Sequence, residues 1–383
     1  MQFGFETAAK ILFGIGTRHE VLPFLKEQGI TRVFMCVGNG RERAAWLVEA
    51  LRSQGVISEL WSVSGEPRVQ DALDAVKAAR EYGAEAVVAL GGGSVIDLGK
   101  GVAALAANPG DVFEYLEVVG KGRPLARPGL PAVALPTTAG TGAEVTKNSV
   151  FEVPEQGVKV SLRSPFLLPK LAIIDPELTL SVPPDVTAHT GFDALAQVIE
   201  PFLSKFATPL TDALCRDAID RGSRALLRAY QDGQDIEART DMAFTSLMGG
   251  LALANARLGA VHGFAGPLGG ACHAPHGALC AALLPAVLAV NLRALQARGE
   301  PRFVDKFAEL ARILTGSASA RPEQGIARIA ALGSALQIPR LSELGVSAAA
   351  AQAAIPAAQR SSSMKGNPIE LTSAELAEIL AAS

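Results

Sequence analysis

Two glycine-rich turns in the first half of the chain have the composition of a nucleotide phosphate site. The apolar run AEAVVAL leads into the turn GGGS (residues 91–94), and the following VIDLGKGVAALAA has a helical pattern. Glycine lets the backbone approach a phosphate closely, and the amides and dipole of a helix N-terminus attract anions. A second apolar run, PAVALP, leads into the hydroxyl-rich loop TTAGTGAE (residues 137–144). A GGGS turn alone equally suits a tight turn without a ligand, but two such loops at the carboxyl edge of one parallel sheet favour a dinucleotide.

The second half of the chain concentrates histidine in one short stretch. His262, His273 and His276 are three of only five histidines in the chain. Imidazole can bind a divalent metal or transfer a proton near neutral pH. Further upstream, Asp193 and Gln197 are four residues apart in HTGFDALAQVIEPF, a spacing that puts both on one face of a helix. These residue types indicate a site in the second half of the chain.

The elements that must position these residues change character near the middle of the chain. From residue 30 to about 180, short β-branched runs alternate with amphipathic segments, which predicts βαβ units and a parallel sheet. After TLSVPPDV, Ala- and Leu-rich segments with a period near 3.6 continue to the C-terminus. We therefore expect a doubly wound α/β nucleotide-binding domain over residues 1–182 and an all-helical domain over 183–383.

Composition excludes several classes of protein. The 383 residues are 49% hydrophobic and 19% charged, with a net charge of -3 and a pI near 6.0. The chain has no run of basic residues, so we expect neither a nucleic acid nor an anionic membrane as a partner. The first residues do not resemble a secretion signal, and no uninterrupted apolar run is long enough to span a bilayer. The four cysteines form no CxxC pair, so a reducing cytoplasm is the expected location.

The two loops together resemble a known family. GGGSVIDLGK, followed by LPTTAGTGAEVT, is similar to the paired cofactor motifs of the iron-containing (group III) alcohol dehydrogenases. The resemblance extends from KILFGIGT near the start to GNPIELTSAELAEIL at the end. It implies hydride transfer between a nicotinamide cofactor and a small alcohol or carbonyl compound. It also implies that the first loop binds the pyrophosphate, that the second lies along the ribose and nicotinamide, and that the cofactor contacts are Gly92, Gly93, Ser94, Asp97, Thr137, Thr138 and Lys159. Lys159 would equally suit a solvated surface position.

In the family, the choice between NAD and NADP depends on the residue at the end of the first strand of the nucleotide-binding domain. NAD-preferring members of the family carry an acidic residue there, and this chain has Gly38. Without a carboxylate nothing repels a 2′-phosphate, and Asn39, Arg41 or Arg43 could donate hydrogen bonds to it. This favours NADP, although NAD remains possible if Gly38 and its neighbours only form a turn.

The resemblance also implies a metal site. The family uses an aspartate, a histidine four residues later, and two histidines 14 residues apart; Asp193, His262 and His276 match this pattern. Such a set suits Fe²⁺ or Zn²⁺, which would polarise the substrate oxygen. Gln197 stands where the family has histidine. Its carbonyl oxygen could still bind the metal, but we expect lower affinity and less selectivity.

A second departure from the family lies at Gly266, where many members have a histidine lining the cleft between the domains. His273 is additional to the usual pattern and lies three residues before His276. We hypothesise that His273 partly replaces the missing imidazole as a hydrogen-bond donor or proton relay to the substrate, with His276 on the metal beside it. The alternative is a loop histidine without a catalytic task.

Three other functions remain open at this point. A metal-independent reductase of the maleylacetate reductase type would stay active after chelation. A lyase resembling dehydroquinate synthase would need a strongly basic pocket, and the helical domain shows little basic clustering. A nucleotide-binding protein without catalysis would bind no metal. The resemblance further implies a small-molecule substrate between the domains and a homodimer or higher oligomer.

Overall fold

The computed structural model describes residues 2–117, 119–156, 158–272 and 274–383. The chain divides into two compact units. One, the α/β unit, spans Thr7–Thr138 and Gly142–Leu180; the other, the helical unit, spans Ser181–Ser383 and includes the residues up to Glu6 and Ala139–Thr141. This division lies two residues before the domain boundary expected after residue 182.

The α/β unit is built on a six-stranded parallel sheet in the order β1-β8-β5-β4-β2-β3. Its strands are β1 (Ile11–Phe13), β2 (Arg32–Gly38), β3 (Ile57–Val63), β4 (Ala86–Gly91), β5 (Ala132–Pro136) and β8 (Leu171–Ile174). An antiparallel hairpin of β6 (Asn148–Val153) and β7 (Val158–Arg163) is added to it in sequence between β5 and β8. The helices are α1 (Val21–Glu27), α2 (Ala45–Ser53), α3 (Val69–Tyr82) and α4 (Gly93–Ala107).

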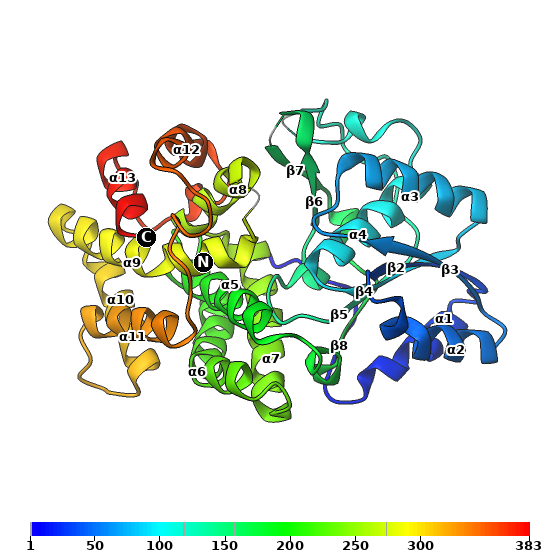
Figure 1. Cartoon of the computed structure of the whole chain (residues 1–383), viewed down its shortest axis with the longest axis horizontal. Helices are drawn as coiled ribbons and strands as arrows, with labels where there is room; N and C mark the ends of the chain where they lie inside the picture. The colour runs from blue at the N-terminus through cyan, green and yellow to red at the C-terminus, as the bar shows by residue number, and fades with distance from the viewer. Residues whose placement is uncertain (1, 118, 157, 273) are drawn as a thin grey trace. The chain divides into compact units, whose positions relative to one another are not determined.

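Helices cover both faces of this sheet because successive strand residues point to opposite sides. In β2, Val33 and Met35 join a core cluster that includes Leu47 and Leu51 of α2, whereas Phe34 joins the cluster formed with α3 and α4. Figure 1 shows α1 and α2 on one side of the strands and α3 and α4 on the other. The predicted doubly wound parallel-sheet fold is confirmed.

The strand order places the glycine turn at a topological switch point. From β2 the chain crosses to β3 on one side, and from β4 it crosses to β5 on the other, although β2 and β4 are neighbours. Open α/β sheets bind ligands at the carboxyl ends of two such strands. Gly38 ends β2 and Gly91 ends β4, so the predicted nucleotide loops lie at this edge.

The helical unit is all α, as predicted. Its helices are α5 (Pro184–Leu203), α6 (Pro209–Gln231), α7 (Ile236–Ala256), α8 (Ala260–Cys272), α9 (His276–Arg298), α10 (Pro301–Thr315), α11 (Pro322–Ala335), α12 (Ala348–Arg360) and α13 (Ser373–Ala382). Proline at the first position of α5 supplies the helical φ without losing a hydrogen bond. Helix α5 is almost wholly buried and packs on α6, α7 and α9, so side chains on α5 face the interior of this unit.

One helix in the described part of the chain, α9, is long and apolar enough to cross a membrane. Of its most apolar 18-residue window, 72% is buried inside the helical unit. It contacts α5, α8 and α11. This burial is that of a core helix, and its apolar composition is explained by the packing.

Candidate active site

Five of the predicted nucleotide residues line one cavity at the switch point, whereas Gly93, Ser94, Asp97 and Lys159 are not in its lining. The cavity has a volume of about 360 Å³, and its lining includes Gly38, Asn39, Gly92, Thr137 and Thr138. The two loops also touch, because a Cβ added at Gly92 would lie 3.3 Å from the Thr138 hydroxyl oxygen. Predicted positions from three different strand ends therefore come together in the α/β unit.

Glycine at the strand-to-helix turn is required by packing. A Cβ at Gly91 would lie 2.5 Å from a methyl carbon of Val95, closer than real Cβ contacts. Gly92 is the N-cap of α4, and Gly93 and Ser94 are its first two residues. The N-terminus of α4 therefore points its first-turn amides at the end of the sheet, as an anion site requires.

The donors predicted for a 2′-phosphate differ in their surroundings. Arg43 lines the cavity beside Gly38 and Asn39. Asn39 donates from Nδ2 to Ser64 Oγ at 3.1 Å, and Arg41 donates from Nε to Ser62 Oγ at 2.7 Å. Arg41 is absent from the lining of this cavity among the described residues. Arg43 is therefore the cation best placed to meet a phosphate there.

Asp97, predicted to contact the cofactor, has protein partners. It accepts from the Val150 amide at 3.1 Å, and it lies 3.0 Å from Nζ of the buried Lys100. Burial raises the pKa of Asp97, and Lys100 opposes this. Lys100 also donates to Ala143 O at 2.8 Å and to Thr146 Oγ1 at 3.0 Å. This pair therefore ties α4 to the segment that follows the second cofactor loop.

Lys159, the other predicted cofactor contact outside the two loops, lies on β7. Its Nζ forms an ion pair with Glu66 at 2.5 Å, and its side chain is only 11% exposed. A solvated surface lysine, the alternative to a cofactor contact, would be far more exposed than this. Contact with the cofactor stays a prediction for both Asp97 and Lys159.

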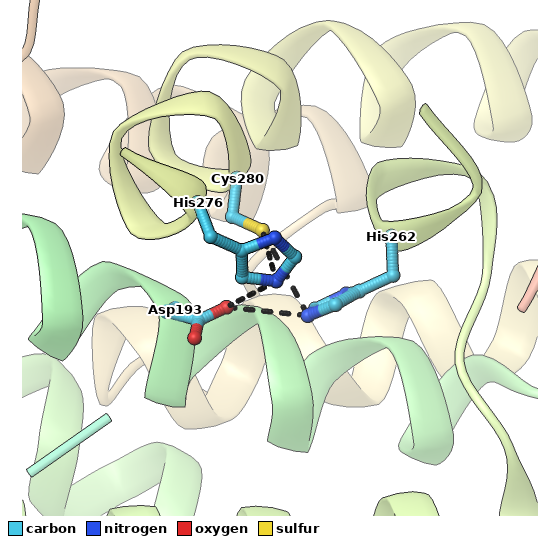
Figure 2. Close-up of side chains that lie close together, drawn as sticks. All are labelled: Asp193, His262, His276 and Cys280. Atoms are coloured by element: carbon cyan, nitrogen blue, oxygen red, sulfur yellow. Dashed lines mark hydrogen bonds and ion pairs between the residues drawn. The ribbon is translucent and has the colours of Figure 1, made fainter. Parts of the chain in front are cut away.

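The predicted metal residues converge inside the helical unit. Asp193 comes from α5, His262 from α8, and His276 is the first residue of α9. His262 Nε2 lies 3.2 Å and His276 Nε2 3.8 Å from Asp193 Oδ1. Figure 2 shows the two rings and the carboxylate pointing toward a common centre, together with the Cys280 thiol. One donor atom from each of the four lies within 4.8 Å of the others, which is a spacing that a single metal ion can bridge.

A buried carboxylate orients the His262 ring. Glu200 Oε2 lies 2.6 Å from His262 Nδ1, and Glu200 Oε1 accepts from the Val261 amide at 2.7 Å. With Nδ1–H donating to Glu200, Nε2 faces Asp193 and is the ring nitrogen that can bind a metal once its proton is displaced. Glu200 also places a negative charge at the N-terminus of α8, where the helix dipole favours it.

The first turn of α9 is held against α5 by close backbone contact. A Cβ at Gly277 would lie 2.5 Å from the carbonyl oxygen of His189. Glycine at this position therefore lets the start of α9 approach α5, and this contact sets the position of His276.

Asp193, His262 and Cys280 affect one another's protonation. Burial lowers the pKa of His262, but the charge on Cys280 and hydrogen bonds with Asp193, Cys280 and Glu200 outweigh this and hold it well above its usual range. Burial raises the pKa of Asp193, but His276 and His262 lower it overall. Burial raises the pKa of Cys280 to about 12, although His262 opposes this. Metal binding at this cluster therefore has to displace protons.

Gln197 lies one turn after Asp193 on α5 and is buried. Its Nε2 donates to the carbonyl oxygen of Gly140 at 2.8 Å. Gly140 belongs to the three-residue segment of the second cofactor loop that groups with the helical unit. The role of Gln197 as a metal ligand stays a prediction.

His273, predicted as a proton relay, lies outside the described residues. Gly266, four residues after His262 on α8, has nothing within 4 Å of an added Cβ. The position where the family pattern has a histidine is therefore open space.

Two residues of the site were missed by the sequence analysis, Cys280 and Glu200. Both could have been found from helical spacing. Cys280 lies four residues after His276, and Glu200 lies seven after Asp193, so each shares a helix face with a predicted ligand.

Both halves of the chain match models of a known protein family. Residues 8–176 match the family described as iron-containing alcohol dehydrogenase, and residues 187–383 match its C-terminal family. A probable alcohol dehydrogenase EutG of Salmonella typhimurium is 34% identical, over 97% of this chain and 92% of the relative. A crystal structure of 1,3-propanediol oxidoreductase superposes with a TM-score of 0.92 at 31% identity, over 100% of this chain and 99% of the other. A sulfoacetaldehyde reductase from Bifidobacterium kashiwanohense, solved with NAD⁺, gives 0.87 at 29% identity, over 100% and 99% of the two chains.

Proposed function

Because the chain belongs to the iron-containing alcohol dehydrogenase family, we propose that Asp193, His262 and His276 hold its divalent metal next to the reacting oxygen of the substrate. The chain is an NAD(P)-dependent oxidoreductase that interconverts a small alcohol and its aldehyde or ketone. The observation that carries the assignment of residues is the convergence of one carboxylate and two imidazoles from three helices within 4.8 Å.

The donor set fits the expected metal. One carboxylate oxygen and two imidazole nitrogens suit Fe²⁺ and Zn²⁺, both of which bind such ligands at about 2.0–2.2 Å. When bound, the metal polarises the substrate oxygen and the nicotinamide gives or takes a hydride. Glu200 keeps the His262 proton on Nδ1, which leaves Nε2 free to bind. Asp193 supplies the negative charge that holds a cation at this buried position.

We propose that NADP is preferred over NAD. The support is that Arg43 lines the cavity at the end of β2 while the described residues lining it include no carboxylate. A guanidinium there would pair with a 2′-phosphate. The test compares kcat/KM with NADPH and NADH in the wild type, Arg43→Ala and Gly38→Asp.

Both variants should change the preference in the same direction for different reasons. Arg43→Ala removes a charge-assisted hydrogen bond of about 1.5–3 kcal/mol, so kcat/KM with NADPH should fall roughly ten- to hundredfold while NADH is little affected. Gly38→Asp adds repulsion and should favour NADH. Equal effects of Arg43→Ala on both cofactors would refute the preference for NADP.

We propose that His273 transfers a proton to or from the substrate oxygen, in addition to the role of His276 on the metal. The support is its position three residues before His276. In addition, the chain has Gly266 where many members of the family have a histidine that lines the cleft. His273→Gln should flatten the pH dependence of kcat with unchanged metal content. An unchanged pH profile would assign His273 to a loop without a catalytic task.

The main experiment combines elemental analysis with a substrate screen. Purified protein is assayed before chelation, after chelation, and after reloading with Fe²⁺ or Zn²⁺, against small aldehydes, ketones and diols with both cofactors. Relatives named for 1,3-propanediol and sulfoacetaldehyde support including a diol and an anionic aldehyde. We expect about one metal per chain and loss of activity on chelation. Full activity in metal-free protein would instead support a metal-independent reductase of the maleylacetate reductase type.

We further propose a cytoplasmic homodimer. Location in a reducing compartment is supported by four free cysteines, and dimerisation by the family resemblance alone. Light scattering of the purified protein tests the oligomeric state, and fractionation of the source cells tests the location.

A further inference from the structure

We propose that the sulfur of Cys280 is the fourth protein ligand of the metal, in the coordination position that the family pattern assigns to residue 197. The inference rests on the proposed metal site and extends it. It adds a thiolate to a ligand set otherwise made of nitrogen and oxygen.

The distances around Cys280 suit one ion held by four protein ligands, with a fifth position left for the substrate oxygen. With metal bonds of about 2.0–2.1 Å to nitrogen or oxygen and about 2.3 Å to sulfur, tetrahedral donors lie roughly 3.3 Å apart for N and O and roughly 3.5 Å apart for N and S. Cys280 Sγ lies 3.8 Å from His262 Nε2 and 3.7 Å from His276 Nε2. The Asp193 contacts with the same two nitrogens are 3.2 and 3.8 Å. Each of these four distances exceeds its tetrahedral value by at most about half an ångström.

The helix that carries Cys280 aims it at the cluster. His276 and Cys280 are four residues apart on α9 and therefore project from one face of its first two turns. Cys280 is fully buried, and its sulfur faces the two imidazoles (Figure 2). A cysteine that merely filled space in the core would face apolar groups.

Gln197 has another partner. Its amide nitrogen donates to the Gly140 carbonyl at 2.8 Å, and both groups are buried. Breaking that bond would leave a buried carbonyl unsatisfied. We assign Gln197 to positioning the segment around Gly140, and Cys280 to the metal.

A thiolate ligand changes which metal the site prefers. Binding forms an S–metal bond and releases the S–H proton to solvent, with no change of oxidation state. A soft sulfur donor beside two imidazoles favours Zn²⁺ over ions that prefer oxygen ligands. The site should therefore retain Zn²⁺ when metals compete.

The test is absorption spectroscopy of the full chain loaded with Co²⁺, a spectroscopic substitute for Zn²⁺. A cobalt–thiolate bond gives a charge-transfer band in the near ultraviolet that nitrogen and oxygen ligands do not give. We expect this band in the wild type, in Gln197→Ala and in the matched control Cys272→Ser, whose thiol instead donates to Leu268 O at 2.9 Å. We expect Cys280→Ser to lose the band and to bind Co²⁺ more weakly.

X-ray absorption of the Zn²⁺-loaded wild type gives a second reading that needs no variant. It should show one sulfur at about 2.3 Å besides the lighter ligands. Stoichiometric metal without a sulfur neighbour would overturn the role of Cys280 and leave the Asp193–His262–His276 site standing. No metal binding by the wild type would overturn both. Absence of the band in the wild type, together with loss of Co²⁺ binding in Gln197→Ala and unchanged Co²⁺ binding in Cys280→Ser, would return the fourth position to Gln197.

Discussion

Glu200 should control the metal affinity of the site without touching the metal. Its carboxylate accepts from His262 Nδ1 at 2.6 Å and from the Val261 amide at 2.7 Å. In Glu200→Gln the side chain keeps its size but can satisfy only one of these donors. If the amide oxygen accepts from Val261, the NH₂ group faces Nδ1, which forces the His262 proton onto Nε2 and blocks the metal. If the amide is flipped, the NH₂ group meets the Val261 N–H, and two donors oppose each other.

The expected loss follows from the bond that is removed. A hydrogen bond to a charged group contributes about 1.5–3 kcal/mol. Since about 1.4 kcal/mol is a factor of ten in affinity, Glu200→Gln should weaken Zn²⁺ binding roughly ten- to hundredfold, the range seen for partners of metal ligands.

The assay is competition for Zn²⁺ between the protein and a coloured chelator. Glu237→Gln serves as the control, because the Glu237 side chain on α7 is 84% exposed and, among the described residues, forms an ion pair only with Arg228. Urea unfolding of the metal-free proteins separates lost affinity from lost folding. Unchanged affinity in a folded Glu200→Gln protein would show that the Glu200–His262 contact does not set the orientation of the ring.

Four further variants test the surroundings of the two sites. Burial raises the pKa of Glu144 from 4.5 to about 7, so its contribution to stability is complete below pH 4.5 and is lost as the pH rises through 7; Glu144→Gln should remove this pH dependence, worth roughly 3 kcal/mol, in urea unfolding at pH 5 and 8. Lys100→Met leaves Asp97, whose side chain is only 15% exposed, without its cation and should lower the free energy of unfolding by about 3–5 kcal/mol, and a change near zero in urea unfolding would contradict this. Gly277→Ala puts a Cβ 2.5 Å from a backbone oxygen and should weaken Zn²⁺ binding, whereas Gly266→Ala, with open space around it, should bind as the wild type does.

The placing of the two glycine-rich loops could be predicted from the sequence because each loop is defined by local structure. The turn at Gly91 and Gly92 is defined by a strand, a tight turn and a helix N-terminus that are consecutive in the chain. The same holds for the loop that begins at Thr137 after β5. Parallel strands end at one edge of a sheet, so two such loops had to meet there.

The partners of buried charges could not be predicted in this way. Asp97 and Lys159 both match cofactor positions of the family, yet one lies beside Lys100 and the other pairs with Glu66. Lys100 bonds to groups 43 to 48 residues away in the chain. A buried charge takes whichever partner the packing brings within reach, and that depends on how distant segments are placed.

The sequence by itself determined the family, the order of sheet and helices, and three residues able to hold a metal, because residue types and spacings along single elements carry that information. Only the tertiary structure decided that Cys280 faces the two imidazoles, that Glu200 orients His262, and that Gln197 bonds to Gly140. The physical reason is that a ligand set is completed by the rotation and packing of helices against one another. The contacts between α5, α8 and α9 fix that rotation, and no segment of sequence contains it alone.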